Sequence, residues 1–438
     1  MLGASEMLNV LTGVWALMLG IVLIMLGNGM HFTLIGLRGG IEGFSAAELA
    51  VVTSGYFVGF LSGARFTPKL ILRVGHVRVF AALGSFMSAG LVAFTLWPDP
   101  WVWTIIRVLI GFCMSGIYVA AESWLNNAST NETRGKLLSA YMIAQTLGII
   151  GAQGLLNLAD AAGSALFVGA SILVSISFAP ILLSVQPAPA VEVARPMSLR
   201  DLFRGSPLGT VGIFLLGGVY ATQSGMGAVF GSEIALSAAE VSLFVAMLFA
   251  GALVLQYPIG WVSDRLDRRK VIFGTAAMGA SACGLGWIAG GEAFAGLGLW
   301  PLMASAFLAG GMTTPLYALL LAYTNDFLPN EDMAAASGGL VFTFGLGAIL
   351  GPLATGAAME RLGPHGFWLG LGASFALMAL YALYRMTQRP VAVTGEETDS
   401  YVGVLPTSSV VAVEAAGAWA ADQGEADRAP DAGDAPPA

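Results

Sequence analysis

Residues 237–270 read SAAEVSLFVAMLFAGALVLQYPIGWVSDRLDRRK, and they hold the features on which the fold assignment depends. A short polar box comes first, an uncharged apolar run over 241–263 follows, and a strongly basic loop ends the stretch. A helix needs about 20 apolar residues to cross the hydrocarbon of a bilayer. The stretch therefore predicts one membrane-spanning helix that ends in a charged loop.

The alternation of apolar run and charged loop recurs along most of the chain. Hydrophobic residues make up 56% of the 438 residues, charged residues only 11%, and the mean hydropathy is +0.78. A soluble domain usually carries about 25% charged residues. The runs are too long for barrel strands and do not alternate as such strands do. They predict an all-α membrane protein with about twelve transmembrane helices. The expected spans are 7–32, 47–65, 77–97, 101–125, 137–158, 165–185, 208–230, 241–261, 271–290, 297–323, 334–359 and 367–385.

The two halves of the chain resemble each other. The box Ser45-Ala-Ala-Glu48 recurs as Ser237-Ala-Ala-Glu240, and further matched pairs keep the same order. These pairs are Gly59 with Gly251, Arg73 with Arg265, Tyr118 with Tyr317, and Asn126 with Asn325. A parallel repeat of two six-helix bundles is a transporter architecture, with the substrate site between the bundles near the midplane. We expect an N-terminal bundle over 1–185, a proline-rich cytoplasmic linker over 186–207 and a C-terminal bundle over 208–389.

The net charge of −8 lies wholly in the C-terminal tail. From Val391 onward there are nine acids and one base, so the remainder is neutral. A basic nucleic-acid-binding face is excluded, and a disulfide scaffold is excluded because the only cysteines, Cys113 and Cys283, lie in apolar runs. Residues 390–438 are rich in Ala, Pro, Asp and Glu, which predicts a disordered acidic cytoplasmic tail that transport does not need.

The basic residues predict the orientation in the membrane. One set of loops holds 15 Lys and Arg residues and the other set holds two, Arg38 and Arg361. Because cytoplasmic loops carry the excess of Lys and Arg, both termini should be cytoplasmic. We expect a multi-pass protein of the cytoplasmic (inner) membrane.

The loop Gly260-Trp-Val-Ser-Asp264-Arg265-Leu-Asp267-Arg268-Arg269-Lys270 resembles the signature of the major facilitator superfamily. The resemblance covers about Met7 to Arg389 and implies that this loop latches one of the two access states. The first-half copy departs from the pattern, because Pro68 replaces its glycine and Leu72 its aspartate. The expected cytoplasmic gate comprises Gly260, Asp264, Arg265 and Arg268, with Arg73 and Arg78 from the first half. The alternative is a basic membrane anchor.

The fourth span holds the strongest functional signal. Arg107, Gly111, Ser115, Tyr118 and Glu122 are spaced so that they share one helical face. An arginine within a span is costly unless it faces water or a partner, so this face should line the cavity between the bundles. The alternative is that Arg107 and Glu122 extend toward opposite membrane surfaces. The stretch from Arg107 into the following loop is similar to the YcaD-type branch of the superfamily, which leaves the substrate undefined.

Three other polar residues complete the expected substrate and coupling pathway. Asn28 and His31 lie on the first span, and the repeat places Gln223 of the seventh span opposite His31. His31 could carry a proton, because its unperturbed pKa is near 6.5, or it could be an interfacial histidine. Glu122 is the first candidate for proton transfer.

Together these features predict a secondary transporter that moves a small molecule by alternating access, either coupled to protons or as an uncoupled facilitator. The other class left open is a membrane receptor or scaffold that recruits a partner through the acidic tail. An enzyme is not expected, because neither a nucleophile elbow nor a zinc-protease motif occurs. We expect a monomer in the lipid bilayer, without a cofactor, a metal site or a nucleic-acid partner.

Overall fold

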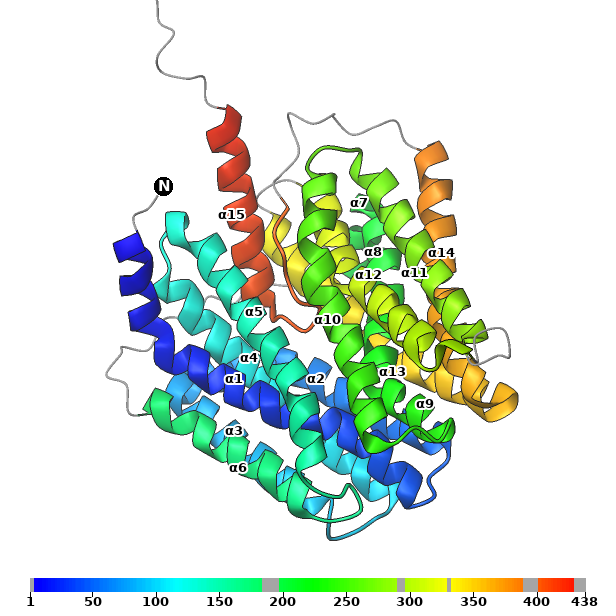
Figure 1. The fold of residues 1–438 in the computed structure, drawn as a ribbon. Helices are drawn as coiled ribbons and strands as arrows, with labels where there is room; N and C mark the ends of the chain where they lie inside the picture. Colours follow the sequence, from blue (N-terminus) through cyan, green and yellow to red (C-terminus); the bar gives the residue numbers. More distant parts are fainter. Residues whose placement is uncertain (1–3, 183–196, 290–295, 329–331, 389–400, 429–438) are drawn as a thin grey trace, which may run out of the picture.

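The computed structural model describes residues 4–182, 197–289, 296–328, 332–388 and 401–428, and the long elements in these ranges are all helices (Figure 1). The first half contains α1 (Ala4–Ile41), α2 (Ala46–Val74), α3 (His76–Ala93), α4 (Pro100–Ala128), α5 (Asn131–Leu155) and α6 (Ala165–Leu182). The second half contains α7 (Leu199–Gly205), α8 (Pro207–Ala221), α9 (Gly227–Glu233), α10 (Ala238–Ser263), α11 (Arg268–Ile288), α12 (Trp300–Asn325), α13 (Met333–Leu362) and α14 (Gly366–Gln388). One more helix, α15 (Val410–Arg428), belongs to the tail.

The helices agree with the expected membrane spans. Nine stretches of the described chain are long and apolar enough to cross a membrane, and one of them, Ala335–Gln388, contains both α13 and α14. In another, a π-helical turn at Thr222–Met226 joins α8 to α9. With α5 and α6, which both pack on α1, these stretches account for the twelve spans. The prediction of an all-α membrane fold is confirmed.

The two halves pack their helices in the same order. In the first half α2 packs on α4, α1 on α5, and α3 on α6. In the second half the matching pairs are α10 with α12, α8 with α13, and α11 with α14. The N-terminal bundle therefore has the same internal arrangement as the C-terminal bundle.

The matched sequence pairs have matching local structures. Ser45 and Ser237 are the N-caps of α2 and α10, and each forms a capping box with the glutamate three residues later. Gly59 and Gly251 lie where these helices cross α4 and α12. A Cβ at Gly59 would lie 1.9 Å from the carbonyl oxygen of Val108, and one at Gly251 would lie 1.8 Å from that of Phe307. Only glycine allows the backbones to approach so closely.

The bundles meet at one end of the molecule, which we call the closed end. There α1 packs on α9 and α2 packs on α13. A Cβ on Gly36 would lie 2.7 Å from the Cβ of Ala228, and one on Gly356 would lie 2.4 Å from the Cβ of Ala50. Deeper in the interface the Ser54 hydroxyl donates a hydrogen bond of 2.7 Å to the carbonyl oxygen of Ile349.

The other end of the interface, which we call the tail end, is occupied by residues 401–428. A non-helical segment over 401–409, with a turn at 406–407, runs between the bundles, and α15 stands against α4, α5 and α13 (Figure 1). This differs from the disorder predicted for 390–438. The tail as a whole is acidic, but residues 401–420 carry one charge, Glu414, and many of their apolar side chains are buried. The remainder of the predicted tail, 390–400 and 429–438, and residues 186–196 of the predicted linker lie outside the described residues.

Candidate functional site

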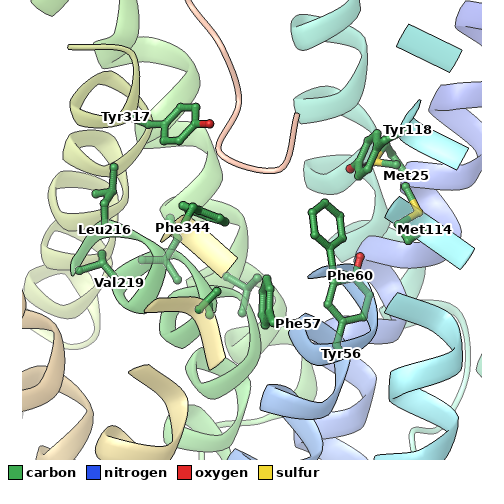
Figure 2. Close-up of a cluster of buried hydrophobic side chains, with 14 of the residues drawn as sticks. Met25, Tyr56, Phe57, Phe60, Met114, Tyr118, Leu216, Val219, Tyr317 and Phe344 are labelled. Atoms are coloured by element: carbon green, nitrogen blue, oxygen red, sulfur yellow. The ribbon is translucent and has the colours of Figure 1, made fainter. Parts of the chain in front are cut away.

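A small pocket with a mixed polar and apolar lining lies between the bundles, at the inner end of the tail segment. Its lining includes Asn28, Tyr118 and Gln153 from the N-terminal bundle, Tyr220 from the C-terminal bundle, and Thr407 from the tail. Aromatic side chains complete the walls, namely Phe32, Tyr56, Phe57 and Phe249. In Figure 2 the tail segment descends between Tyr317 on one side and Tyr118 on the other. These two tyrosines are a matched pair of the repeat, and Tyr118 also lines the pocket.

Glu122 is the carboxylate nearest the tail in the N-terminal bundle. Glu122 lies on α4 close to the tail end, and its side chain is buried there. The Tyr141 hydroxyl donates a hydrogen bond of 3.2 Å to Oε1, and the Ser409 backbone N–H donates one of 2.7 Å to Oε2. Both carboxylate oxygens therefore have a donor, which offsets the cost of burying the group.

Arg107 lies in the interior of the N-terminal bundle, toward the closed end. Its Nη1 is 3.1 Å from Nδ1 of His31, and its guanidinium lies over the rings of Phe32 at 4.1 Å and Tyr56 at 4.7 Å. These aromatic contacts stabilise a buried cation. Because Phe32 and Tyr56 also line the pocket, Arg107 stands directly behind the pocket wall. His31 packs against Phe94, with ring centroids 4.7 Å apart.

The polar face of α4 thus divides into separate sites. Fifteen residues of helix, about 22 Å, separate Arg107 from Glu122, and the structure does not bring them together. Between them, Ser115 faces α2, because a Cβ on Gly63 would lie 2.9 Å from its Cβ. Tyr118 lines the pocket, and its hydroxyl donates to Sδ of Met25 at 3.4 Å. Spacing along one helix could not show this division, because it depends on which neighbour covers each turn.

The other expected pathway residues lie in both bundles. Asn28 lines the pocket directly, as described above. Gln223 is buried in the C-terminal bundle, where its Oε1 accepts a hydrogen bond of 2.9 Å from the Thr313 hydroxyl. The structure therefore places Asn28 and Tyr118 at the pocket, and Arg107, His31, Ser115 and Gln223 within the bundles around it.

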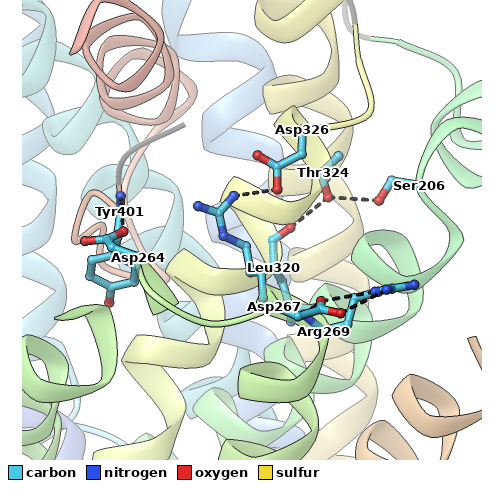
Figure 3. A network of polar contacts seen from close by, with 9 residues as sticks. Ser206, Asp264, Asp267, Arg269, Leu320, Thr324, Asp326 and Tyr401 are labelled. Carbon is cyan, nitrogen blue, oxygen red and sulfur yellow. Dashed lines mark hydrogen bonds and ion pairs between the residues drawn. The ribbon is translucent and has the colours of Figure 1, made fainter. Parts of the chain in front are cut away.

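The signature loop contacts the tail. The Asp264 carboxylate accepts a hydrogen bond of 3.0 Å from the Tyr401 backbone N–H (Figure 3). The Tyr401 ring covers Gly260, where a Cβ would lie 2.5 Å from the ring. The close contact at Gly260 is therefore made by the tail.

The basic residues of the same loop are held within the C-terminal bundle. Arg268 pairs with Asp326 at 2.5 Å, with both side chains buried. Arg269 bonds to Asp267 at 2.9 Å. Burial opposes ionisation of Asp267, yet hydrogen bonds from Arg269 keep the pKa of this carboxyl below its usual value. Arg265 stacks on Trp261, 4.0 Å from the ring centroid. Arg73 and Arg78 of the first half are exposed.

Sequence reasoning missed the tail residues that enter the site, above all Tyr401, Thr407 and Ser409. The signal was the uncharged run at 401–413 within an otherwise acidic tail. Averaging the composition over the whole tail concealed it. Across the described residues, no group of three His, Cys, Asp or Glu side chains is placed to hold a metal ion.

The family model of the Major Facilitator Superfamily matches residues 17–233 and, a second time, residues 209–421. The chain belongs to the Major Facilitator Superfamily. The two matches begin 192 residues apart, which is the offset that relates Ser45 to Ser237. The superfamily consists of membrane transporters and is generally not enzymatic, so the protein is a multi-pass inner-membrane transporter of a small molecule.

Curated relatives within the superfamily are uncharacterized transporters. One, from Enterobacter sp. strain 638, is 25% identical over 372 residues, which is 84% of this chain and 94% of the relative. Another, named YcaD, from Escherichia coli O17:K52:H18, is 25% identical over 392 residues, or 86% of this chain and 98% of the relative. The resemblance to the YcaD-type branch is confirmed.

Solved superfamily structures share the fold. The nucleoside transporter NupG aligns with a TM-score of 0.66 at 15% identity, over 86% of this chain and 99% of that one. A bacterial homologue of the human lysosomal transporter Spinster aligns with a TM-score of 0.64 at 13% identity, over 92% and 96%. At these identities the likeness shows the fold alone.

Proposed function

We propose that the protein is a secondary transporter that moves a small molecule across the cytoplasmic membrane by alternating access. The observation that carries the proposal is the asymmetry of the interface. The bundles are in contact at the closed end, whereas the pocket and the tail separate them at the tail end. Rocking of two matched bundles about a central pocket would close one end while it opens the other.

We further propose that the tail end faces the cytoplasm. The basic loops support this orientation, because 13 of their Lys and Arg residues in the described part of the chain lie at or beside helix ends on the tail side. Both termini are then cytoplasmic, and the tail lies on the cytoplasmic side of the pocket. The monomer suffices for this mechanism, because one chain supplies both bundles.

Once Thr407 of the tail has left, the remaining lining would suit a neutral solute that has polar groups and a flat apolar portion. The polar part of this lining consists of hydroxyl and amide groups on Asn28, Tyr118, Tyr220 and Gln153. Aromatic rings in the walls would stack on a flat ring system. Nucleosides, which the name of one solved structural neighbour specifies as its substrate, are therefore a sensible first group of compounds for testing.

Two groups are candidates for ion coupling. Glu122 is a buried carboxylate near the tail end, and it could become exposed to water if the tail moved away. It remains our first candidate for carrying a proton. Arg107 and His31 form the second group, behind the pocket wall. An uncoupled facilitator is the alternative. A facilitator would move substrate without proton flux, whereas a proton-coupled transporter that uses Glu122 would show proton flux that is lost in the Glu122→Gln variant. Coupled transport that keeps its wild-type pH response in this variant would remove Glu122 from the mechanism.

A receptor or scaffold that recruits a partner through the tail is the second candidate function. The burial of residues 401–420 against the chain's own helices favours an intramolecular role for this part of the tail.

The proposed function is tested with the purified full-length protein. A thermal-shift screen over nucleosides and other neutral metabolites should find at least one stabilising ligand. Proteoliposomes should then exchange that ligand across the membrane, and Asn28→Ala should weaken its binding because Asn28 lines the pocket. A ligand that binds tightly but never crosses the membrane would contradict transport and favour a receptor.

A further inference from the structure

The tail contacts both bundles along the whole depth of the tail end. At the entrance, the Tyr401 N–H bonds to Asp264 of the C-terminal bundle. At the inner end, Thr407 lines the pocket with Asn28 and Tyr118 of the N-terminal bundle. The seven residues 401–407 thus lead from the signature loop to the proposed substrate pocket.

The carboxylate proposed for coupling is occupied by the same segment. The Ser409 N–H donates to Oε2 of Glu122 at 2.7 Å, at the point where the non-helical segment leads into α15. A hydrogen bond to a charged acceptor is among the stronger ones in proteins. A substrate or a proton that approached Glu122 from the tail end would have to displace this contact.

The helix α15 then fills the opening above the pocket. The Trp419 ring covers Gly135 of α5, where a Cβ would lie 2.5 Å from the ring. On the other side, a Cβ on Gly417 would lie 3.2 Å from Nδ2 of Asn325, at the end of α12. Val413 and Ala416, which precede these contacts in the same helix, are also buried. The helix is therefore wedged between the two bundles.

Two glycines of the bundles make room specifically for the tail. At Gly135 the three atoms nearest to an added Cβ all belong to Trp419, and at Gly260 they all belong to Tyr401. Neither glycine is needed there for contact between the membrane helices. Because these glycines have no side chain, the Trp419 and Tyr401 rings of the tail can pack directly against the two helices.

We propose that residues 401–420 are a tethered plug that occupies the substrate pathway and blocks transport until it leaves. The proposal rests on the proposed function, because it assigns the pocket and Glu122 to substrate transport. While the plug is seated, solute cannot reach the pocket from the tail end. The bundles also cannot approach each other there, so the opposite access state cannot form. The connection to α14 keeps the plug at a high effective concentration near its site.

The seating of the plug can be measured in the full-length chain without a known substrate. Tyr220, which lines the pocket under Thr407, is replaced by cysteine, and its rate of modification by a water-soluble maleimide is followed. The native Cys113 and Cys283 are buried and should give little background. Gly135→Leu is added to displace Trp419. Gly154→Leu on the same helix is the matched control, because a Cβ there would meet nothing within 4 Å.

The plug predicts that Gly135→Leu raises the modification rate of Tyr220→Cys at least about tenfold, because overpacking of this kind is strongly unfavourable. Gly154→Leu should leave the rate unchanged. Equal rates in all three proteins would overturn the proposal. If Gly135→Leu does not fold, Gly260→Leu at the Tyr401 contact provides the same test from the other bundle.

A crosslink gives a second, independent readout. Gly417→Cys and Asn325→Cys should form a disulfide under mild oxidation, whereas Gly417→Cys with Trp300→Cys should not, because Trp300 lies at the opposite end of α12 from Asn325. Flux of an identified substrate should stop in the crosslinked chain and return on reduction. Unaltered flux with the crosslink intact would overturn the blocking role, whereas a crosslink in a chain that never transports would contradict only the proposed function.

Discussion

The hydrogen bond between the Ser409 N–H and Glu122 contributes to the free energy that holds the plug in place, and this contribution can be predicted. We consider Glu122→Gln and Glu122→Ala in the full-length Tyr220→Cys chain. The glutamine keeps the shape of the side chain and an acceptor oxygen, but the Ser409 N–H at 2.7 Å then bonds to a neutral group. Hydrogen bonds to charged groups contribute about 1.5–3 kcal/mol, and neutral ones about 0.5–1.5 kcal/mol. The plug should therefore lose about 1 kcal/mol.

These free energies translate into modification rates. A loss of about 1 kcal/mol raises the open population, and with it the modification rate of Tyr220→Cys, by about fivefold. Glu122→Ala removes both acceptors, so a loss of about 1.5–3 kcal/mol should raise the rate by about 10–150-fold. The measurement is valid when the plug opens and closes faster than the thiol reacts, and the rate is then proportional to maleimide concentration.

A double-mutant cycle isolates the bond itself. Ser409→Pro removes the backbone N–H, so in the Glu122→Ala background it should add much less than it does in the parent chain. Ser409→Ala keeps the N–H and serves as the control. Full additivity of Ser409→Pro and Glu122→Ala would refute the reasoning, because it would mean that the two groups do not interact.

Three further predictions concern the tail helix, the repeat and the buried cation. When the plug is seated, burial raises the pKa of Glu414 to about 7. Seating of the plug is then linked to proton uptake by Glu414, so the plug should be held most strongly below the ordinary glutamate pKa of about 4.3. Its binding should weaken as the pH rises through about 7. The modification rate of Tyr220→Cys in the parent chain, divided by its rate in the Gly135→Leu chain to cancel the rise of thiol reactivity with pH, should increase over that interval, and Glu414→Gln should flatten this ratio. Gly59→Ala and Gly251→Ala should each lower the thermal unfolding temperature in detergent, since about 1–3 kcal/mol of overpacking is introduced, whereas Gly154→Ala should not; equal temperatures would contradict the assigned helix crossings. Arg107→Ala should abolish flux while the protein still inserts and purifies normally, and unchanged flux would exclude a role for the Arg107–His31 group.

The fold could be predicted from the sequence because the bilayer imposes a simple rule on it. Runs without charge between basic loops can hardly form anything but spanning helices. The repeated Ser-Ala-Ala-Glu boxes marked equivalent helix starts, and the structure shows them as equivalent capping boxes. Local patterns of this kind need no knowledge of distant contacts.

The site was harder to predict because its parts come from distant segments. Helical spacing placed Arg107 and Glu122 on one face, but it could not show that aromatic side chains cover the first and the tail covers the second. Ser409 lies 287 residues from Glu122 in the chain. No periodicity connects such residues, and the acidic residues around the segment concealed its ability to be buried.

Alternating access is the central claim, and distances across the two ends test it most directly. Spin labels at Ile41 and Glu233 report on the closed end, and labels at Asn127 and Leu266 report on the tail end. In membranes, the chain with Gly135→Leu should show two populations, in which a longer distance at the closed end accompanies a shorter one at the tail end. In the parent chain, with the plug seated, the tail-end distance should keep a single long value. A closed end that never opens in either chain would contradict transport by alternating access.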